Sequence, residues 1–285
     1  LNFRTLLPEY VHITDGAPAF HFDEHYEKDY IKLLFAEMSK DSIRALAHSH
    51  AMTVTEYLSC VLVLGVIRSV EAPITQPITI SIPVDLRRFF PTKTLRNFTI
   101  ESHISFEPNG RRDYTLEDIL EAMQGSLKAS LKKELLQKDL NKFGALKTNP
   151  VLRAVPYFIK KPVLAVLQKG SHKDATTIFT NLGERTPPAL LANAVEKYRF
   201  INGDTRRYGL PVTCSCVSFR DTLSLCFSRT NRETAWFDAC VEILRAQDLA
   251  VATEIIEGTA PCKPPKKDRK GRIAGPDAVK AFFNI

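Results

Sequence analysis

A charged corner between two alternating segments offers the clearest candidate chemistry in this sequence. Residues 78–84 alternate apolar and more polar side chains and then meet Asp85, Leu86 and Arg87. One interpretation is that Asp85 and Arg87 are surface charges at the end of a strand, because charged residues are mostly exposed. The other is that Arg87 points into a site and pairs with a carboxylate held elsewhere, since an arginine–carboxylate pair can be rigid and bidentate.

A second group of polar residues ends a later segment of strand-like sequence. Residues 176–183 read TTIFTNLG, so the polar pair Thr180 and Asn181 comes just before Leu182 and Gly183. In open α/β sheets ligands gather at the ends of strands. These two residues are therefore candidates for a binding site.

Several side chains resemble metal ligands, but their spacing does not predict a metal site. The HxDxH spacing of His21, Asp23 and His25 would put all three on one face of a strand, yet no further ligand is evident, which favours a structural role. The six cysteines form no CxxC pair. Cys214 and Cys216 share one face of a predicted strand and are typical of small core residues in a reducing cytoplasm, where we expect the protein to reside.

Most of the formal net charge of +7 lies at the C-terminal end of the sequence. Residues 261–285 hold seven lysines and arginines against two aspartates, which gives this segment a charge of +5. A basic tail is more often solvated than bound to polyanions, so we expect no nucleic-acid partner. The sequence has no apolar run of about eighteen residues and no signal peptide at its start, so we expect no membrane span.

Periodicity and capping residues predict the elements that position these side chains. Strands are expected at residues 30–37, 78–84, 98–106, 176–183, 195–202, 211–219, 222–229 and 249–256. Helices are expected from Ser39 to about 50, from the Thr53–Glu56 capping box to about 70, as one long helix with an apolar stripe over 116–135, over 149–168, and from an Asn231 cap to about 245. This order predicts an α/β (α+β) fold with a mixed β-sheet flanked by helices. Residues 1–29 read as a connector, 30–256 as one subdomain and 257–285 as a basic Pro- and Lys-rich tail.

An ordered series of short motifs resembles the C-terminal half of a CoA-dependent acyltransferase. These motifs are TVTEYL at 53–58, VDLR at 84–87, Asn97-Phe98, TNLG at 180–183 and the LSLCFS hairpin strand at 223–228. The superfamily is that of chloramphenicol acetyltransferase and condensation domains, and the bacterial alcohol acetyltransferase-like branch is the most similar. The likeness covers roughly residues 1–256 and implies a chloramphenicol acetyltransferase-like half.

The resemblance implies that a second half is needed for catalysis. Enzymes of this superfamily have two similar halves with a tunnel between them and an HHxxxD motif in the N-terminal half. None of the seven histidines here is adjacent to another, so the motif is absent and no residue of this chain is a convincing general base. The implied partner is the N-terminal half of the same enzyme. Acetyl-CoA or another acyl-CoA would be a cosubstrate and not a tightly bound cofactor, and the acceptor a small alcohol or amine.

The resemblance also assigns roles to single residues. Arg87 would brace the site by pairing with the aspartate of the missing motif, and Asn97 would line the tunnel. Thr180 and Asn181 match a segment near the thioester that could help hold an oxyanion. The family's DFGWG-type sequence is replaced here by Thr-Asn-Leu-Gly, as in the wax-ester and alcohol-type relatives.

Two other functions fit the same pattern. One is a non-catalytic binding or scaffold module, because a fold does not fix a function. The other is a condensation-domain fragment that acts on carrier-bound thioesters. If half of the tunnel is missing, a large apolar patch should lie open, so we expect the isolated chain to self-associate.

Overall fold

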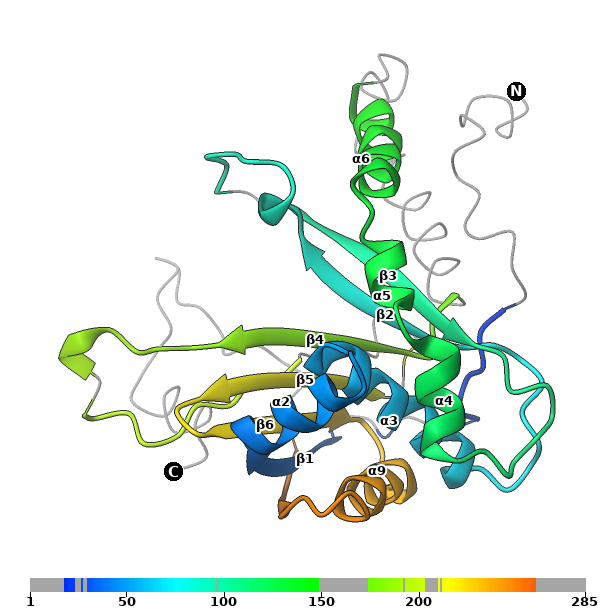
Figure 1. Ribbon diagram of the computed structural model, residues 1–285. Coiled ribbons are helices and arrows are strands. Elements are labelled where there is room, and N and C mark those ends of the chain that lie inside the picture. The colour runs from blue at the N-terminus through cyan, green and yellow to red at the C-terminus, as the bar shows by residue number, and fades with distance from the viewer. Residues whose placement is uncertain are drawn as a thin grey trace, which may run out of the picture.

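A mixed β-sheet forms the centre of the protein in a computed structural model that describes residues 18–23, 27, 30–95, 97–148, 174–191, 193–202, 210 and 212–259. Its strands are β1 (Tyr30–Ser39), β2 (Ile78–Asp85), β3 (Thr99–Phe106), β4 (Thr177–Glu184), β5 (Val212–Phe219), β6 (Thr222–Arg229) and β7 (Ala252–Thr259). Their order across the sheet is β3-β2-β4-β5-β6-β1-β7 (Figure 1). β4 is parallel to β2 and β5, while the other neighbours are antiparallel. The predicted α/β fold with a mixed sheet is confirmed.

Helices pack against one face of this sheet and bury the main core. They include α2 (Lys40–Ser49), α3 (Val54–Ser69) and α9 (Ala235–Arg245). The capping box of α3 forms as predicted, since the Glu56 carboxylate accepts from the Thr53 main-chain N–H at 3.0 Å and the Glu56 N–H donates to the Thr53 hydroxyl at 3.2 Å. α3 is buried almost all round, because strands cover one side of it and α9 and the next helix along the chain cover others.

The predicted long helix after Thr115 is broken into three. These helices are α4 (Leu116–Met123), α5 (Ser126–Ser130) and α6 (Lys133–Thr148). Gly125 adopts a left-handed conformation with φ of 73° between the first two. This residue turns the chain so that Leu127 packs with the main core beside β3 while Leu136 joins a second small cluster with Val84. The apolar stripe is thus real but does not belong to one straight helix.

Replacing Gly125 by alanine tests this break. A Cβ there meets no atom within 4 Å, so the expected loss of about 1 kcal/mol in unfolding free energy comes from the left-handed backbone alone. Urea unfolding measures it. Gly258→Ala is the matched control, because Gly258 also has open space around its Cβ position but has no left-handed φ. Equal stability of the two variants would contradict the prediction.

Three other element boundaries differ from the sequence-based expectation. Residues 195–202 form no strand, and two of their side chains, those of Arg199 and Asn202, anchor the segment to the sheet instead. The N-cap of α9 is Thr234 and not Asn231, whose side-chain oxygen accepts from Arg229 Nε at 3.0 Å. The last strand is shifted from 249–256 to 252–259, because the ladder with β1 pairs Thr259 with Tyr30. The helix predicted at 149–168 lies outside the described residues.

The prediction that Cys214 and Cys216 are small core residues is confirmed. Cys214 and Cys216 are fully buried in the main core, and the other described cysteines are buried free thiols. Cys262 lies outside the described residues.

Within the described ranges no single helix is long and apolar enough to cross a bilayer. α2 and α3 reach that length only together, and a bend of 85° separates them.

Candidate functional site

The predicted site residues lie on two arms that separate at one end of the sheet. β2 and β4 pair only at Ile80–Thr177 and Ser81–Ile178, after which their C-terminal halves diverge (Figure 1). The β2–β3 hairpin continues on one arm, and β4 continues beside β5 on the other. We call residues 85–99 the hairpin tip and residues 180–184 the β4 end.

Arg87 pairs with a carboxylate of its own turn. Its guanidinium donates to Asp85 Oδ1 at 3.0 Å and to the carbonyl oxygen of Thr94 at 3.2 Å. Asp85 Oδ1 also accepts the Arg87 N–H at 3.1 Å and so caps the short 3-10 helix η2 (Leu86–Arg88). That main-chain hydrogen bond, followed by the guanidinium, lowers the pKa of the exposed Asp85 carboxyl. Arg87 is therefore fixed at the hairpin tip, and its pairing with an aspartate of another half stays a prediction.

Asn97 lies on the returning arm of the same tip. Its side chain is exposed, and its Oδ1 accepts from the Thr99 hydroxyl. The neighbouring Phe98 carbonyl accepts the Leu86 N–H at 3.0 Å, which closes the base of the tip. The structure thus brings Arg87 and Asn97 onto one turn, and the tunnel-lining role of Asn97 stays a prediction.

Thr180 and Asn181 point to opposite faces of the sheet, because successive strand residues alternate. Asn181 Nδ2 donates to the Thr55 hydroxyl at the start of α3 at 3.0 Å, and its Oδ1 accepts the Gly183 N–H at 2.7 Å. On the other face, the Thr180 hydroxyl accepts from Asn202 Nδ2 at 3.4 Å. The two side chains therefore do not converge on one atom, and only one of them can face a given oxyanion.

Thr55 and Asn202 contact the β4 end, and sequence analysis did not single out either of them. Thr55 lies between the two capping residues of α3, Thr53 and Glu56, at a position whose type the capping motif does not fix. Asn202 also donates to the Cys214 carbonyl at 2.9 Å and so holds residues 195–202 against the sheet. No local pattern predicts either contact, since each joins residues far apart in the sequence.

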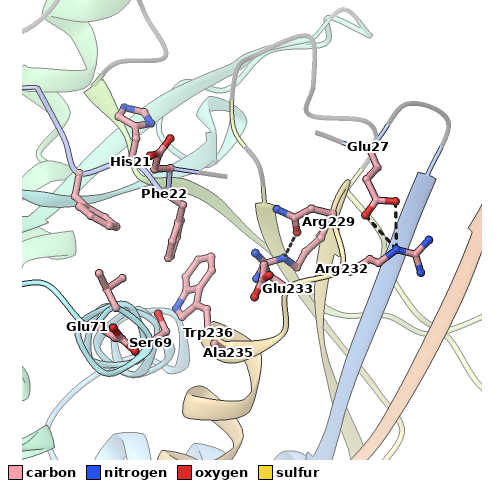
Figure 2. Close-up of a pocket in the computed structure, with 14 residues that line it drawn as sticks. His21, Phe22, Glu27, Ser69, Glu71, Arg229, Arg232, Glu233, Ala235 and Trp236 are labelled. Carbon is pink, nitrogen blue, oxygen red and sulfur yellow. Dashed lines mark hydrogen bonds and ion pairs between the residues drawn. The ribbon is translucent and has the colours of Figure 1, made fainter. Parts of the chain in front are cut away.

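A separate pocket of about 730 Å³ lies at the opposite end of the sheet (Figure 2). It is lined by residues that precede β1, by the C-terminal end of α3 with the two residues after it, and by residues from the end of β6 to the start of α9. None of the four predicted site residues lines it. His21 and Asp23 line it, whereas His25 lies outside the described residues. The described part of the chain contains no group of three or more His, Cys, Asp or Glu side chains placed to hold a metal ion.

Comparison with known proteins gives matches at the level of structure. No family model matches the sequence, and no curated protein matches it. TRI3 trichothecene 15-O-acetyltransferase from Fusarium sporotrichioides is similar in structure with a TM-score of 0.59 and 14% identity, over 86% of this chain and 54% of that one. A structure that describes condensation domain-mediated chain release from the enacyloxin polyketide synthase is also similar to this chain. Its TM-score is 0.51 and its sequence identity 9%, over 85% of this chain and 46% of that one.

These similarities establish the fold. The chain has the fold of the TRI3 O-acetyltransferase and of the enacyloxin condensation domain, and the ordered motifs predicted a fold of this kind. It spans about half the length of the solved structures it matches. At such low identities the similarity carries no residue role with it.

Proposed function

We propose that this chain is the C-terminal half of an acyl-CoA-dependent O- or N-acyltransferase and forms one wall of its substrate and CoA tunnel. The observation that carries this proposal is the match over 86% of this chain to 54% of an O-acetyltransferase. If this chain is one half of a two-half enzyme, nearly all of it should align with about half of a complete enzyme, and this is the coverage found.

Exposed leucines at the separated arms support a covering partner. Leu95 at the hairpin tip is 100% exposed, and Leu190 on the short 3-10 helix η4 (Ala189–Leu191), which follows β4, is 93% exposed. Each is an apolar side chain of the size that contributes about 1.5–3 kcal/mol when it is buried. Both lie beyond the C-terminal ends of β2 and β4, where the N-terminal half of the same enzyme would pack.

The proposed reaction transfers an acyl group from the CoA thioester to a small alcohol or amine. A general base of the N-terminal half takes the proton from the acceptor as its oxygen or nitrogen attacks the thioester carbonyl. The carbon–sulfur bond then breaks, and the CoA thiolate leaves and takes up a proton. In this scheme Arg87 braces the joint between the halves, Asn97 lines the tunnel, and Thr180 or Asn181 donates toward the oxyanion.

The test compares this chain with the longer protein that includes the preceding coding sequence. CoA release from acetyl-CoA is measured with a panel of small alcohols and amines. We expect turnover by the longer protein and none by residues 1–285 alone. Turnover by residues 1–285 alone would contradict the half-enzyme proposal. A longer protein that binds CoA but shows no turnover would favour a non-catalytic module.

Arg87→Ala is expected to lower the acyl-transfer rate of the complete enzyme about tenfold or more, because the brace at the joint is lost. The melting temperature of the isolated chain should change by less than about 2 °C, since partly exposed ion pairs contribute little. Arg88→Ala is the matched control from the same turn and should leave the rate unchanged. Equal losses of acyl-transfer rate in the two variants would contradict a special role for Arg87.

We expect the isolated chain to self-associate through the exposed leucines. Light scattering coupled to size-exclusion chromatography should show a mass above 32.1 kDa at high concentration. Leu95→Ser combined with Leu190→Ser should return the chain to a monomer. A monomeric parent chain at high concentration would contradict this.

A condensation domain acting on carrier-bound thioesters is the second candidate, supported by the match to the enacyloxin structure. The two candidate functions differ in the acyl donor, so turnover measured with a carrier-protein thioester and with acetyl-CoA distinguishes them. For either function we place the protein in the reducing cytoplasm, since the described cysteines are buried thiols without disulfides.

A further inference from the structure

The pocket at the far end of the sheet has an aromatic wall. Phe20, Phe22 and Trp236 line it, with ring centroids 5.3 Å apart for Phe20 and Phe22 and 5.2 Å apart for Phe22 and Trp236. Trp236 is fixed by a hydrogen bond of 3.0 Å from its Nε1 to the Leu62 carbonyl. Aromatic rings can pack against the methylene groups of a ligand and can attract a cation to a ring face.

The charged residues around this wall are predominantly acidic. Asp23, Glu27, Glu71 and Glu233 line the pocket against Arg229 and Arg232, which leaves a formal net charge of −2 with His21 neutral. Figure 2 shows Glu71 and Glu233 on either side of Trp236. This net negative charge favours a positive ligand, although the formal net charge of the whole chain is +7.

The two arginines are already engaged within the protein. Arg232 Nε lies 3.1 Å from a Glu27 carboxylate oxygen, and Arg229 Nε donates to Asn231 Oδ1 at 3.0 Å. In contrast, no ion pair joins the side chain of Asp23, Glu71 or Glu233 to any described residue; Arg112 donates only to the main-chain carbonyls near Glu71. These three carboxylates thus have no cationic partner among the described residues.

We propose that this pocket binds a primary alkylammonium group. The ammonium carries three donors for the carboxylates, and the alkyl chain lies along Phe20, Phe22 and Trp236. This site is distinct from the separated arms of β2 and β4, so it does not depend on the acyltransferase proposal.

The alkylammonium can come from a free amine or from the chain's own lysines. β7 ends at Thr259, which pairs with Tyr30, and the Arg232 guanidinium lies 4.7 Å from the Tyr30 ring centre. The sequence therefore leaves the sheet beside the pocket rim, and Lys263, Lys266 and Lys267 follow within a few residues. Four to eight extended residues span roughly 13–28 Å, which is enough to reach across a pocket of this size.

Trp236 is the only tryptophan of the chain, so its fluorescence reports on the pocket directly. The full chain is titrated with pentylamine, and with pentanol and pentanoate as matched neutral and anionic probes. We expect a saturable change with pentylamine and binding about tenfold or more weaker for the other two. Added salt should weaken the amine binding, because screening acts on the charge.

Substitutions test whether the acidic residues of the pocket bind the amine. Asp23→Asn combined with Glu233→Gln should weaken pentylamine binding about tenfold, while Glu121→Gln, an exposed carboxylate on α4, should leave it unchanged. All of these side chains are exposed, so the fold is expected to survive, and thermal melting checks this. Equal affinities for pentylamine and pentanol would overturn the proposal.

A lysine-neutralised chain distinguishes the sources. Lys263→Gln, Lys266→Gln and Lys267→Gln are combined and titrated with pentylamine. Binding about fivefold or more tighter than in the parent identifies the chain's own lysines as the occupant, and unchanged binding identifies a free amine. The absence of binding in both chains overturns the proposal.

Discussion

Gly65→Ala is expected to cost about 2–3 kcal/mol of unfolding free energy, because the added methyl group has no space. A Cβ at this position would lie 2.3 Å from Cys240 Sγ and 3.1 Å from the indole ring of Trp236. Gly65 of α3 faces α9, where Trp236 donates to the Leu62 carbonyl of α3 and Cys240 to the Val61 carbonyl. Urea unfolding followed by circular dichroism measures the loss.

A double-mutant cycle with Cys240→Ala identifies the clash as the cause. Removing Sγ opens room for the new methyl group, so the double variant should be about 1 kcal/mol more stable than the sum of the single losses predicts. Cys60→Ala is the matched control, since Cys60 is also a buried thiol but lies on α3 itself and donates toward the Ile119 carbonyl. Coupling as large with Cys60 as with Cys240 would contradict the explanation.

The elements that the sequence predicted well are those fixed by local interactions. Thr53 and Glu56 cap α3 through atoms three residues apart, and Ser39 caps α2 in the same way. The alternation in β2 and β3 sets which face meets the core, because a strand shifted by one residue would bury its polar side. Such signals need no knowledge of the rest of the chain.

The errors occur where a distant contact decides between two local possibilities. The apolar stripe continues across Gly125, so periodicity alone cannot place a left-handed residue there. Residues 195–202 have the composition of a strand but no ladder, because Arg199 and Asn202 hold them to the sheet through side chains. Asn231 is a good cap by type, yet Arg229 engages its oxygen, and the helix begins later.

The candidate site was only partly predictable for the same reason. The Asp-x-Arg spacing is typical of an aspartate that accepts the N–H two residues on, so the Asp85–Arg87 contact is available from the sequence. The Asn181–Thr55 contact joins residues 126 positions apart and has no such signature. The pocket beside Trp236 is likewise assembled from distant segments, namely the residues before β1, the end of α3, and the stretch from the end of β6 to the start of α9.

Arg199→Met is expected to lower the unfolding free energy by about 2–4 kcal/mol at neutral pH, because it leaves the Glu37 carboxylate buried without its main partner. Arg199 Nε lies 2.8 Å from Glu37 Oε1, the guanidinium also contacts Glu254, and the two paired side chains are only 14% and 16% exposed. Lys197→Met is the matched control. Lys197 reaches the same Glu37 at 2.9 Å but is 54% exposed, so its loss should stay below about 1 kcal/mol.

The pH dependence separates the ion pair from the packing of Arg199. Burial by itself raises the pKa of Glu37, but hydrogen bonds from Arg199 and Lys197 outweigh it and hold the pKa below its ordinary value. A pKa that is lower in the folded than in the unfolded state gives stability that is present above the unfolded pKa of about 4.3 and is lost as the pH falls through the folded pKa. In Arg199→Met burial still acts and one hydrogen-bond donor is gone, so this contribution shrinks.

The stability difference between the parent chain and Arg199→Met should therefore be largest above about pH 5 and should decrease toward pH 3. Urea unfolding at several pH values measures it. Arg199 also lies over the Phe35 ring, 4.1 Å from its centre, and that stacking does not depend on the charge of Glu37. A difference that stays constant from pH 7 to pH 3 would assign the role of Arg199 to this stacking and not to the ion pair.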